Sequence, residues 1–288
     1  NRRKIQVRTL VNEDFSLSND MVNRFSKNYS LRDYQEKAIN YLSASNWRGV
    51  IVLPTGAGKT IIGMEAIYRL KVRTLIVVPT IDLMSQWVSN LIRALNVSRG
   101  NIHLYGGGSY QIGEITIVTY ASAKKKEFLE KAIDYFGLVI FDEAHHLTGE
   151  LNRETAKRLI AKYRVGLTAT PGEEDAVRIL KKLVGPIFRI AGFKSLVSKG
   201  FLAPFDFKRI FVKLDDDEDR RYRELMVKYL NYVNKIDARN EIERFNELVR
   251  RSVRDREARE ALLARIEAKN IAMRSRGKIE AIDKLLKK

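Results

Sequence analysis

Two acids and two imidazoles follow an apolar run within five positions of the chain, in the stretch LVIFDEAHH (138–146). Imidazole and carboxylate groups are the usual ligands of zinc and non-haem iron, so a transition-metal site is one interpretation of Asp142, Glu143, His145 and His146. The chain has only three His and no Cys, and neighbouring side chains on an extended segment point to opposite sides. The alternative is a buried parallel strand that presents its last residues to a ligand at the carboxyl edge of a sheet.

A glycine-rich stretch, GVIVLPTGAGKT (49–60), favours the second interpretation. It ends a strand pattern and opens a helix, which is the context that a phosphate-binding loop requires. Gly56 and Gly58 permit the tight turn, and the freed backbone N–H groups and the helix N-terminus suit a phosphate. The strict pattern GxxxxGK[ST] fails at its first position, where Leu53 stands, so the prediction depends on GAGKT and its flanks.

From this loop we predict an ATP site that also binds Mg²⁺. Lys59 would reach the β- and γ-phosphates, and the Thr60 hydroxyl would ligate Mg²⁺. Asp142 would complete the coordination sphere of the ion, and Glu143 would polarise the attacking water. Because Mg²⁺ prefers oxygen ligands, the two histidines need not bind metal. The predicted catalytic residues are Lys59, Asp142 and Glu143, the metal ligands are Thr60 and Asp142, and the phosphate loop comprises Thr55, Gly56, Ala57, Gly58, Lys59 and Thr60.

The composition describes a globular protein with a strong positive charge. Of the 288 residues, 45% are hydrophobic and 31% are charged, and the formal net charge is +18. Such an imbalance favours a polyanionic partner, above all nucleic acid. The absence of Cys excludes a disulfide framework. No apolar run approaches the roughly 20 residues of a membrane span, and the polar start NRRKIQVRT is not a signal peptide. We expect an intracellular protein, in the cytoplasm or nucleoid, with no membrane partner.

Apolar runs alternate with helical patterns from Leu31 to about Ile190, which predicts βαβ units in a doubly wound parallel sheet, an α/β fold. The runs are GVIVLP (49–54), TLIVVP (74–79), ITIVTY (115–120), LVIF (138–141) and RVGLTA (164–169). The helix-length segments between them are 33–44, 59–70, 81–95, 121–135 and 151–162.

After Pro204 the pattern changes. FDFKRIFVKL (205–214) alternates like a strand, and a highly charged helical region follows, which we interpret as a helical hairpin appended to the main domain. Acids from Asp215 to Asp219 suit a helix N-terminus. Apolar stripes at three- and four-residue steps would form the hairpin core: Tyr222, Leu225, Met226, Tyr229, Leu230 and Val233 in one, and Ala258, Leu262, Leu263 and Ile266 in the other.

Together these motifs resemble those of the superfamily two helicases and translocases, whose first RecA-like domain is a P-loop NTPase fold. LRDYQEKAI (31–39), PTGAGKT (54–60), VVPTIDLMSQW (77–87), DEAH (142–145) and TAT (168–170) occur in the order of that superfamily. Within it, LRDYQ, DEAHHL, GLTATP, VGPIF and GFLAPF look like the XPB-type DNA translocases of repair and transcription. The resemblance implies ATP and Mg²⁺ as cofactors, and double-stranded DNA or a DNA fork as partner.

The resemblance also implies roles for single residues. Arg32 and Gln35 would bind ATP, with Gln35 at the adenine edge. His145 would couple the nucleotide site to Thr168 and Thr170, which pass the change towards DNA. The role of His146 stays open between a coupling and a structural imidazole.

Residues at predicted strand ends are candidates for nucleic-acid contacts that do not depend on base sequence. Pro79 and Thr80 follow one strand and Thr119 and Tyr120 another, and the loop 105–108 is a further candidate. The charged helices occupy the place of a DNA-gripping, thumb-like element in the XPB-type family, and its basic candidates are Arg250, Arg251, Arg254 and Arg256. The archaeal branch of that family suggests a nuclease partner for this helical segment.

The expected organisation is an accessory segment at 1–30, an ATP-binding RecA-like domain at 31–214, the thumb-like segment at 215–272 and the start of a linker or second motor domain at 273–288. Two departures from the family matter. Its Arg-Glu-Asp triplet reads Glu173, Glu174, Asp175 here, and nothing after Pro171 resembles the second motor domain with its arginine motif. We therefore expect weak hydrolysis by this chain alone.

Two further functions stay open. The chain could be the motor part of another superfamily two enzyme, such as a restriction or phage recombination helicase, or a nucleotide-gated scaffold that binds nucleic acid. The sequence distinguishes neither DNA from RNA nor unwinding from translocation.

Overall fold

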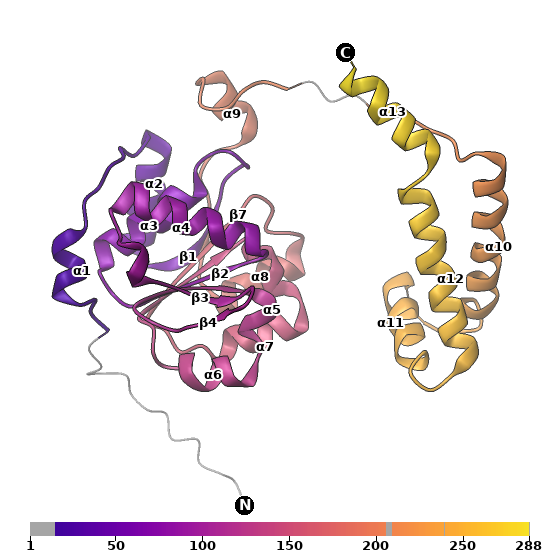
Figure 1. Cartoon of the computed structure of the whole chain (residues 1–288), viewed down its shortest axis with the longest axis horizontal. Coiled ribbons are helices and arrows are strands. Elements are labelled where there is room, and N and C mark those ends of the chain that lie inside the picture. The colour runs from indigo at the N-terminus through magenta and orange to yellow at the C-terminus, as the bar shows by residue number, and fades with distance from the viewer. Residues whose placement is uncertain (1–14, 206–208, 239, 288) are drawn as a thin grey trace, which may run out of the picture. The chain divides into compact units, whose positions relative to one another are not determined.

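The computed structural model describes residues 15–205, 209–238 and 240–287, apart from the side chain of Ile242. The chain divides into two compact units, Asn1–Pro204 and Phe205–Lys288, which we describe separately (Figure 1).

An eight-stranded sheet forms the centre of the first unit, in the order β4-β3-β5-β2-β6-β7-β1-β8. Neighbouring strands are parallel except β3 and β4. The strands are β1 (Arg48–Val52), β2 (Thr74–Val78), β3 (Ile102–Gly106), β4 (Ser109–Tyr110), β5 (Ile115–Thr119), β6 (Leu138–Asp142), β7 (Tyr163–Thr168) and β8 (Ile187–Arg189). The strands that the sequence predicts are the contiguous centre of this sheet, and the strands that it does not predict, β3, β4 and β8, lie towards its edges.

Helices cover both faces of the sheet, so the prediction of a doubly wound α/β fold is confirmed (Figure 1). Alternate strand residues separate into two apolar cores: Ile51 and Ile140 pack with α2–α4, whereas Val50 and Phe141 pack with helices that include α6 and α8. The elements are α1 (Asn19–Arg24), α2 (Asp33–Ala44), α3 (Lys59–Leu70), α4 (Ile81–Leu95), η1 (Arg99–Asn101), α5 (Tyr120–Ala123), α6 (Lys126–Ala132), η2 (Ala144–Thr148), α7 (Glu150–Arg158), α8 (Glu174–Leu183) and α9 (Phe193–Ser198).

Residues 15–30 pack on this same unit. Leu17 and Met21 are buried in the core beside α2–α4, and the Tyr29 hydroxyl donates a hydrogen bond of 2.8 Å to a carboxylate oxygen of Glu65. That carboxylate is 2% exposed and also pairs with Lys27 at 2.9 Å, so the buried charge is compensated. The rest of the predicted segment 1–30, residues 1–14, lies outside the described residues.

The second unit consists of α10 (Asp216–Val233), α11 (Glu241–Arg251), α12 (Arg256–Met273) and α13 (Arg276–Leu286), of which α10 and α12 lie side by side (Figure 1). The Asp215 side chain accepts from the backbone N–H of Glu218 at 2.8 Å, as the acidic run predicts for a helix start. None of the helices in the described part of the chain is both long and apolar enough to span a bilayer.

Two predicted details of the chain after Pro204 are wrong. Small residues, not large ones, form the buried face of α12: Ala258, Ala261, Ala264 and Ala268 are buried, whereas Leu263 is 57% exposed. Alanines allow two helices to approach closely, and the larger side chains are then left outside. The strand expected over 205–214 is also absent from the described residues Arg209–Leu214. An alternating segment needs another strand to pair with, and here Ile210 and Val212 instead line a surface hollow with residues of α13.

This arrangement predicts unequal effects for two leucines of the second unit. Leu248→Ala removes a fully buried side chain from the small core with Val233 and Ile236, so its unfolding free energy falls by about 2–5 kcal/mol. The matched control Leu263→Ala changes a side chain that is 57% exposed, and we expect a loss within about 0.5 kcal/mol. Urea denaturation followed by helical circular dichroism measures both, and equal losses would contradict the observed packing.

Candidate nucleotide site at the carboxyl edge of the sheet

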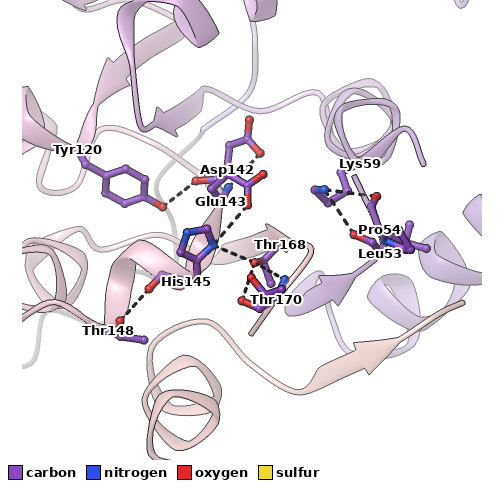
Figure 2. Close-up of polar contacts among 10 residues, drawn as sticks. All are labelled: Leu53, Pro54, Lys59, Tyr120, Asp142, Glu143, His145, Thr148, Thr168 and Thr170. Atoms are coloured by element: carbon purple, nitrogen blue, oxygen red, sulfur yellow. Dashed lines mark hydrogen bonds and ion pairs between the residues drawn. The ribbon is translucent and has the colours of Figure 1, made fainter. Parts of the chain in front are cut away.

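The glycine-rich loop connects β1 to α3 and closes tightly. Gly56 and Gly58 have φ values of +81° and +76°, in the left-handed region that favours glycine. A Cβ on Gly58 would lie 2.5 Å from Gln35 Nε2, so a side chain there would collide as well. Lys59 is 9% exposed, and its ammonium donates to the carbonyls of Leu53 and Pro54 at 3.4 and 3.5 Å (Figure 2).

The start of α2 braces this loop. Gln35 accepts from the Arg32 backbone N–H at 3.0 Å and donates from Nε2 to the Ala57 carbonyl at 3.2 Å. The Tyr34 hydroxyl donates to the same carbonyl at 3.0 Å. Gln35 is buried, and its amide holds the phosphate loop in place. A contact with adenine would use the second hydrogen of this amide.

Phe201 and Leu202, which the sequence analysis did not select, pack over these residues. The Phe201 ring lies 5.0 Å from the Arg32 guanidinium and 5.3 Å from the Tyr34 ring. The Leu202 side chain lies 3.2 Å from the position of a Cβ on Gly56. The stretch GFLAPF (200–205), which contains both residues, contributed to the family resemblance but was not selected as part of the nucleotide site.

The second part of the site is the end of β6. Alternation places Asp142 on the same face as Leu138 and Ile140, towards α3 and α4. There Trp87 Nε1 donates a hydrogen bond of 2.8 Å to Asp142 Oδ2, and both residues are buried. Burial raises the pKa of Asp142, while the Trp87 hydrogen bond opposes this effect and Glu143 adds to it.

The next residue, Glu143, turns the chain sharply. It has φ +47° and ψ +55°, a conformation that costs energy for a residue with a side chain and that clusters at functional sites. Its backbone N–H donates to Asp142 Oδ1 at 3.0 Å. Its carboxylate lies 3.4 Å from His145 Nδ1, so the turn directs Glu143 towards the predicted coupling residues.

A chain of contacts runs from β6 to β7 (Figure 2). His145 Nδ1 lies 3.2 Å from Thr168 Oγ1, and this hydroxyl donates to the Thr170 carbonyl at 3.2 Å. His145 and Thr168 are thus in contact through their side chains, whereas Thr170 takes part through its backbone and not through the expected hydroxyl.

His146 follows His145 in η2. Its ring packs at 4.5 Å from that of His145 and at 5.4 Å from that of Tyr120. Burial lowers the pKa of His146, and the neighbouring His145 adds to the effect. His146 is exposed apart from these two ring contacts, so its role stays open.

The candidates for nucleic-acid contacts come together on one side of the same edge. β3, β5 and β2 are neighbours in the sheet, and Thr80 and Thr119 accept from the backbone N–H groups of Leu83 and Ser122, at the starts of α4 and α5. A Cβ on Gly107 would lie 3.3 Å from the Ile81 side chain, so the glycine loop after β3 borders the start of α4. Pro79 lies beside Thr80 and is partly exposed.

Tyr120 differs from the expectation. It is 7% exposed and its hydroxyl donates to the Asp142 carbonyl at 3.0 Å (Figure 2). This hydroxyl therefore supports the end of β6 instead of facing a phosphate.

Two exposed lysines, which the sequence analysis did not select, lie directly after Tyr120 and α5 in the chain. Lys124 and Lys125 come after the short helix α5, and Lys125 lies 4.8 Å from the Tyr110 ring of β4. The lysine run after a strand end was the available signal.

The predicted arginines of the second unit are exposed, and most pair with acids on their own helices. Arg250 and Arg251 lie 3.9 and 2.9 Å from Glu247, and Arg256 lies 2.9 Å from Glu260. Arg254 makes no ion pair within the described part of the chain. The acids Glu173, Glu174 and Asp175 begin α8, where the helix dipole favours negative charge.

The donors at the edge suit Mg²⁺ with a nucleotide. Among the described residues, no three or more His, Cys, Asp or Glu side chains gather as a metal cage. Asp142 and the Thr60 hydroxyl are oxygen donors, and an ion held partly by phosphates and water needs few protein ligands.

Comparisons with known proteins agree with this geometry. Residues 28–173 match the profile of the family described as "Type III restriction enzyme, res subunit". The chain is 40% identical over 258 residues to "DNA 3'-5' translocase XPB2" of Sulfurisphaera tokodaii, covering 89% of this chain and 57% of that protein. It is 34% identical to "DNA 3'-5' helicase XPB" of Kineococcus radiotolerans, covering 67% of this chain and 36% of that protein. The chain thus spans about half or less of the length of these curated relatives.

Among solved structures, the helicase domain of Pyrococcus furiosus Hef superposes with a TM-score of 0.52 at 21% sequence identity. The superposition covers 84% of this chain and 57% of the Hef chain, and it supports the fold. The profile matches half of the chain, and the matched residues include the phosphate loop and the end of β6. The chain therefore belongs to the family described as "Type III restriction enzyme, res subunit", and it is similar to relatives that are named XPB translocase or helicase.

Proposed function

We propose that this chain is the ATP-binding motor domain of a duplex DNA translocase of the XPB type, acting in repair or transcription. One observation carries the proposal: three neighbouring strands end at one carboxyl edge. They bring together the phosphate loop after β1, Thr168 at the end of β7 and the Asp142–Glu143 pair at the end of β6. The names of the relatives, DNA translocase and helicase, support DNA as the partner.

Each residue of the edge has a chemical part in ATP hydrolysis. Lys59 would exchange two long contacts with carbonyls for shorter, charge-assisted contacts with phosphate oxygens. Thr60 and Asp142 would hold Mg²⁺, which neutralises phosphate charge when bound. Glu143 would orient the attacking water. Arg32 and Gln35 would place the adenine beside the loop that Gln35 already braces.

The contact chain supplies a route from nucleotide to DNA. A change in Glu143 as the phosphate leaves would alter its 3.4 Å contact with His145, and through it the bond to Thr168. The strand end at Pro79–Thr80, with Lys124 and Lys125, would track phosphates without reading bases. Thr119 is 6% exposed and would contribute by capping the start of α5 beside them. Arg250, Arg251 and Arg254 of the second unit would add a salt-sensitive contact. A nuclease partner of the helical unit, and an intracellular location, remain predictions.

A second candidate is the motor of a restriction enzyme, because the matching family profile is described by a restriction subunit. The XPB-type translocase and the restriction-enzyme motor have the same motif set. Movement along duplex DNA driven by ATP hydrolysis would therefore be common to the two candidates. A scaffold without hydrolysis fits less well, since the strained turn at Glu143 has no purpose in a protein that only binds nucleotide.

Glu143→Gln tests the hydrolytic role. The amide keeps the shape but orients water poorly, so single-turnover hydrolysis should fall by about 10²- to 10⁴-fold while Mg·ATP binding persists. Lys59→Ala should instead lose ATP binding and retain binding to duplex DNA. Quench-flow with protein in excess, with and without duplex, measures the rates. Undiminished hydrolysis in Glu143→Gln would remove this residue from the mechanism.

Phe201→Ala tests the base side of the site. Without the ring, Arg32 and Tyr34 lose their packing, and ATP affinity should fall about threefold to tenfold. Tripolyphosphate, which has no base, should bind as before. Phe211→Ala, which removes a ring that is 89% exposed, is the matched control. Equal losses for ATP and tripolyphosphate in Phe201→Ala would show a general effect on the loop.

The lysines after α5 give a prediction about DNA. Changing Lys124 and Lys125 to Ala should reduce the slope of log K against log salt for duplex binding by up to about two, since each phosphate contact contributes about one. The control changes Lys181 and Lys182, which are exposed at the end of α8 and precede β8, at the opposite edge of the sheet. Fluorescence anisotropy at several salt concentrations measures the slopes, and similar slopes for both pairs would exclude this surface.

A further inference from the structure

Trp87 occupies an unusual place for a core tryptophan. It lies on α4, is 1% exposed and is among the largest fully buried side chains of the described residues. A buried indole N–H needs a hydrogen-bond acceptor. Its acceptor is the carboxylate of Asp142, at 2.8 Å, and not a backbone carbonyl.

The surrounding helices leave room for this ring. On α3, a Cβ at position 63 would lie 2.7 Å from Trp87 Cη2, closer than real Cβ contacts, and Gly63 stands there. Glycine weakens a helix interior, so a compensating reason is expected where it occurs. Here the glycine lies on the helix that begins at the phosphate loop, and it admits the ring that reaches Asp142.

Both oxygens of Asp142 are held by protein donors. Oδ2 accepts from the Trp87 indole at 2.8 Å, and Oδ1 accepts from the Glu143 backbone N–H at 3.0 Å. Each carboxylate oxygen has two lone pairs, so one on each remains for a cation or its water. The plane of the carboxylate is therefore fixed before any ligand binds.

We propose that Trp87 is a positioning residue that fixes the Asp142 carboxylate for Mg²⁺ through its indole N–H. The inference rests on the proposed function, because Mg²⁺ at Asp142 is part of it. Groups that orient a metal ligand typically change metal affinity by roughly 10- to 100-fold when they are removed. α4 also begins at the Pro79–Thr80 strand end, so the same helix connects the Mg²⁺ carboxylate with a proposed DNA contact.

The test is equilibrium binding of fluorescently labelled ATP to the 288-residue chain, in Mg²⁺ and in EDTA. In Trp87→Phe the ring remains and the N–H is lost. The gain in affinity that Mg²⁺ provides should fall by about tenfold or more, and Mg²⁺-free affinity should stay unchanged. Trp47→Phe removes the other tryptophan, which packs against the same core, and should change neither affinity.

A second variant keeps the test valid if Trp87→Phe folds poorly. In the Trp47→Phe background, position 87 is filled with benzothienylalanine, in which sulfur replaces the indole N–H and the shape is retained. The same loss of Mg²⁺-dependent affinity is expected, because the packing of the ring is kept and only the N–H donor to Asp142 is removed.

The outcomes separate the two ideas. If the parent chain gains affinity from Mg²⁺ and both variants keep that gain, the positioning role is wrong and the proposed function stands. Equal losses with and without Mg²⁺ would assign Trp87 to packing alone. If the parent chain binds no ATP, or gains nothing from Mg²⁺, the proposed function fails and this inference fails with it.

Discussion

The parallel pairing of β6, β7 and β1 is the constraint on which the rest of the site depends. Its register places Asp142 opposite Leu167 and Val52 opposite Thr168, and the Leu53 N–H donates to the Thr168 carbonyl at 3.1 Å. Three strand ends therefore reach one edge at the same level. A phosphate loop, a hydroxyl and a carboxylate pair that are far apart in the sequence become neighbours for this reason.

Burial gives the edge its chemical character and its cost. Lys59 and Asp142 are nearly buried charges, and Lys59 lowers the pKa that burial of Asp142 raises. Hydrogen bonds from Trp87 and from the Glu143 backbone compensate the carboxylate, because a buried charge without partners is strongly destabilising. The left-handed backbone conformation of Glu143 adds a further unfavourable free energy, which the packing around it must offset. A preorganised site of this kind spends folding energy to orient its donors before the ligand arrives.

Much of this could be predicted from the sequence, and the parts that could not have physical reasons. Central strands such as TLIVV are apolar on both faces and therefore visible, whereas β8 is short and mostly half-exposed, and gives little signal. The phosphate loop and the DEAH strand end carry their own patterns. Trp87 has no such pattern in the sequence, because an apolar residue at helical spacing looks like an ordinary core residue. Only the fold shows that its N–H donates to Asp142.

The helical unit shows the opposite error. Hydrophobic spacing favoured Leu263 and Ile266 as core residues, yet close helix packing buries the alanines and exposes both larger side chains. The hydroxyl of Tyr120 was expected at the surface because its strand ends there, but the backbone of β6, two strands away in the sheet, supplies a buried acceptor. Such choices depend on the partner element, which local sequence does not specify.

One measurement tests the central claim directly: a crystal structure of this chain with ADP, Mg²⁺ and beryllium fluoride. The account predicts that the Lys59 ammonium leaves the Leu53 and Pro54 carbonyls and binds a phosphate oxygen. It also predicts that Mg²⁺ lies between the Thr60 hydroxyl and the Asp142 carboxylate, and that the Glu143 carboxylate faces the beryllium fluoride. A nucleotide bound away from the 54–60 loop, or a metal ion ligated by His145 and His146, would contradict it.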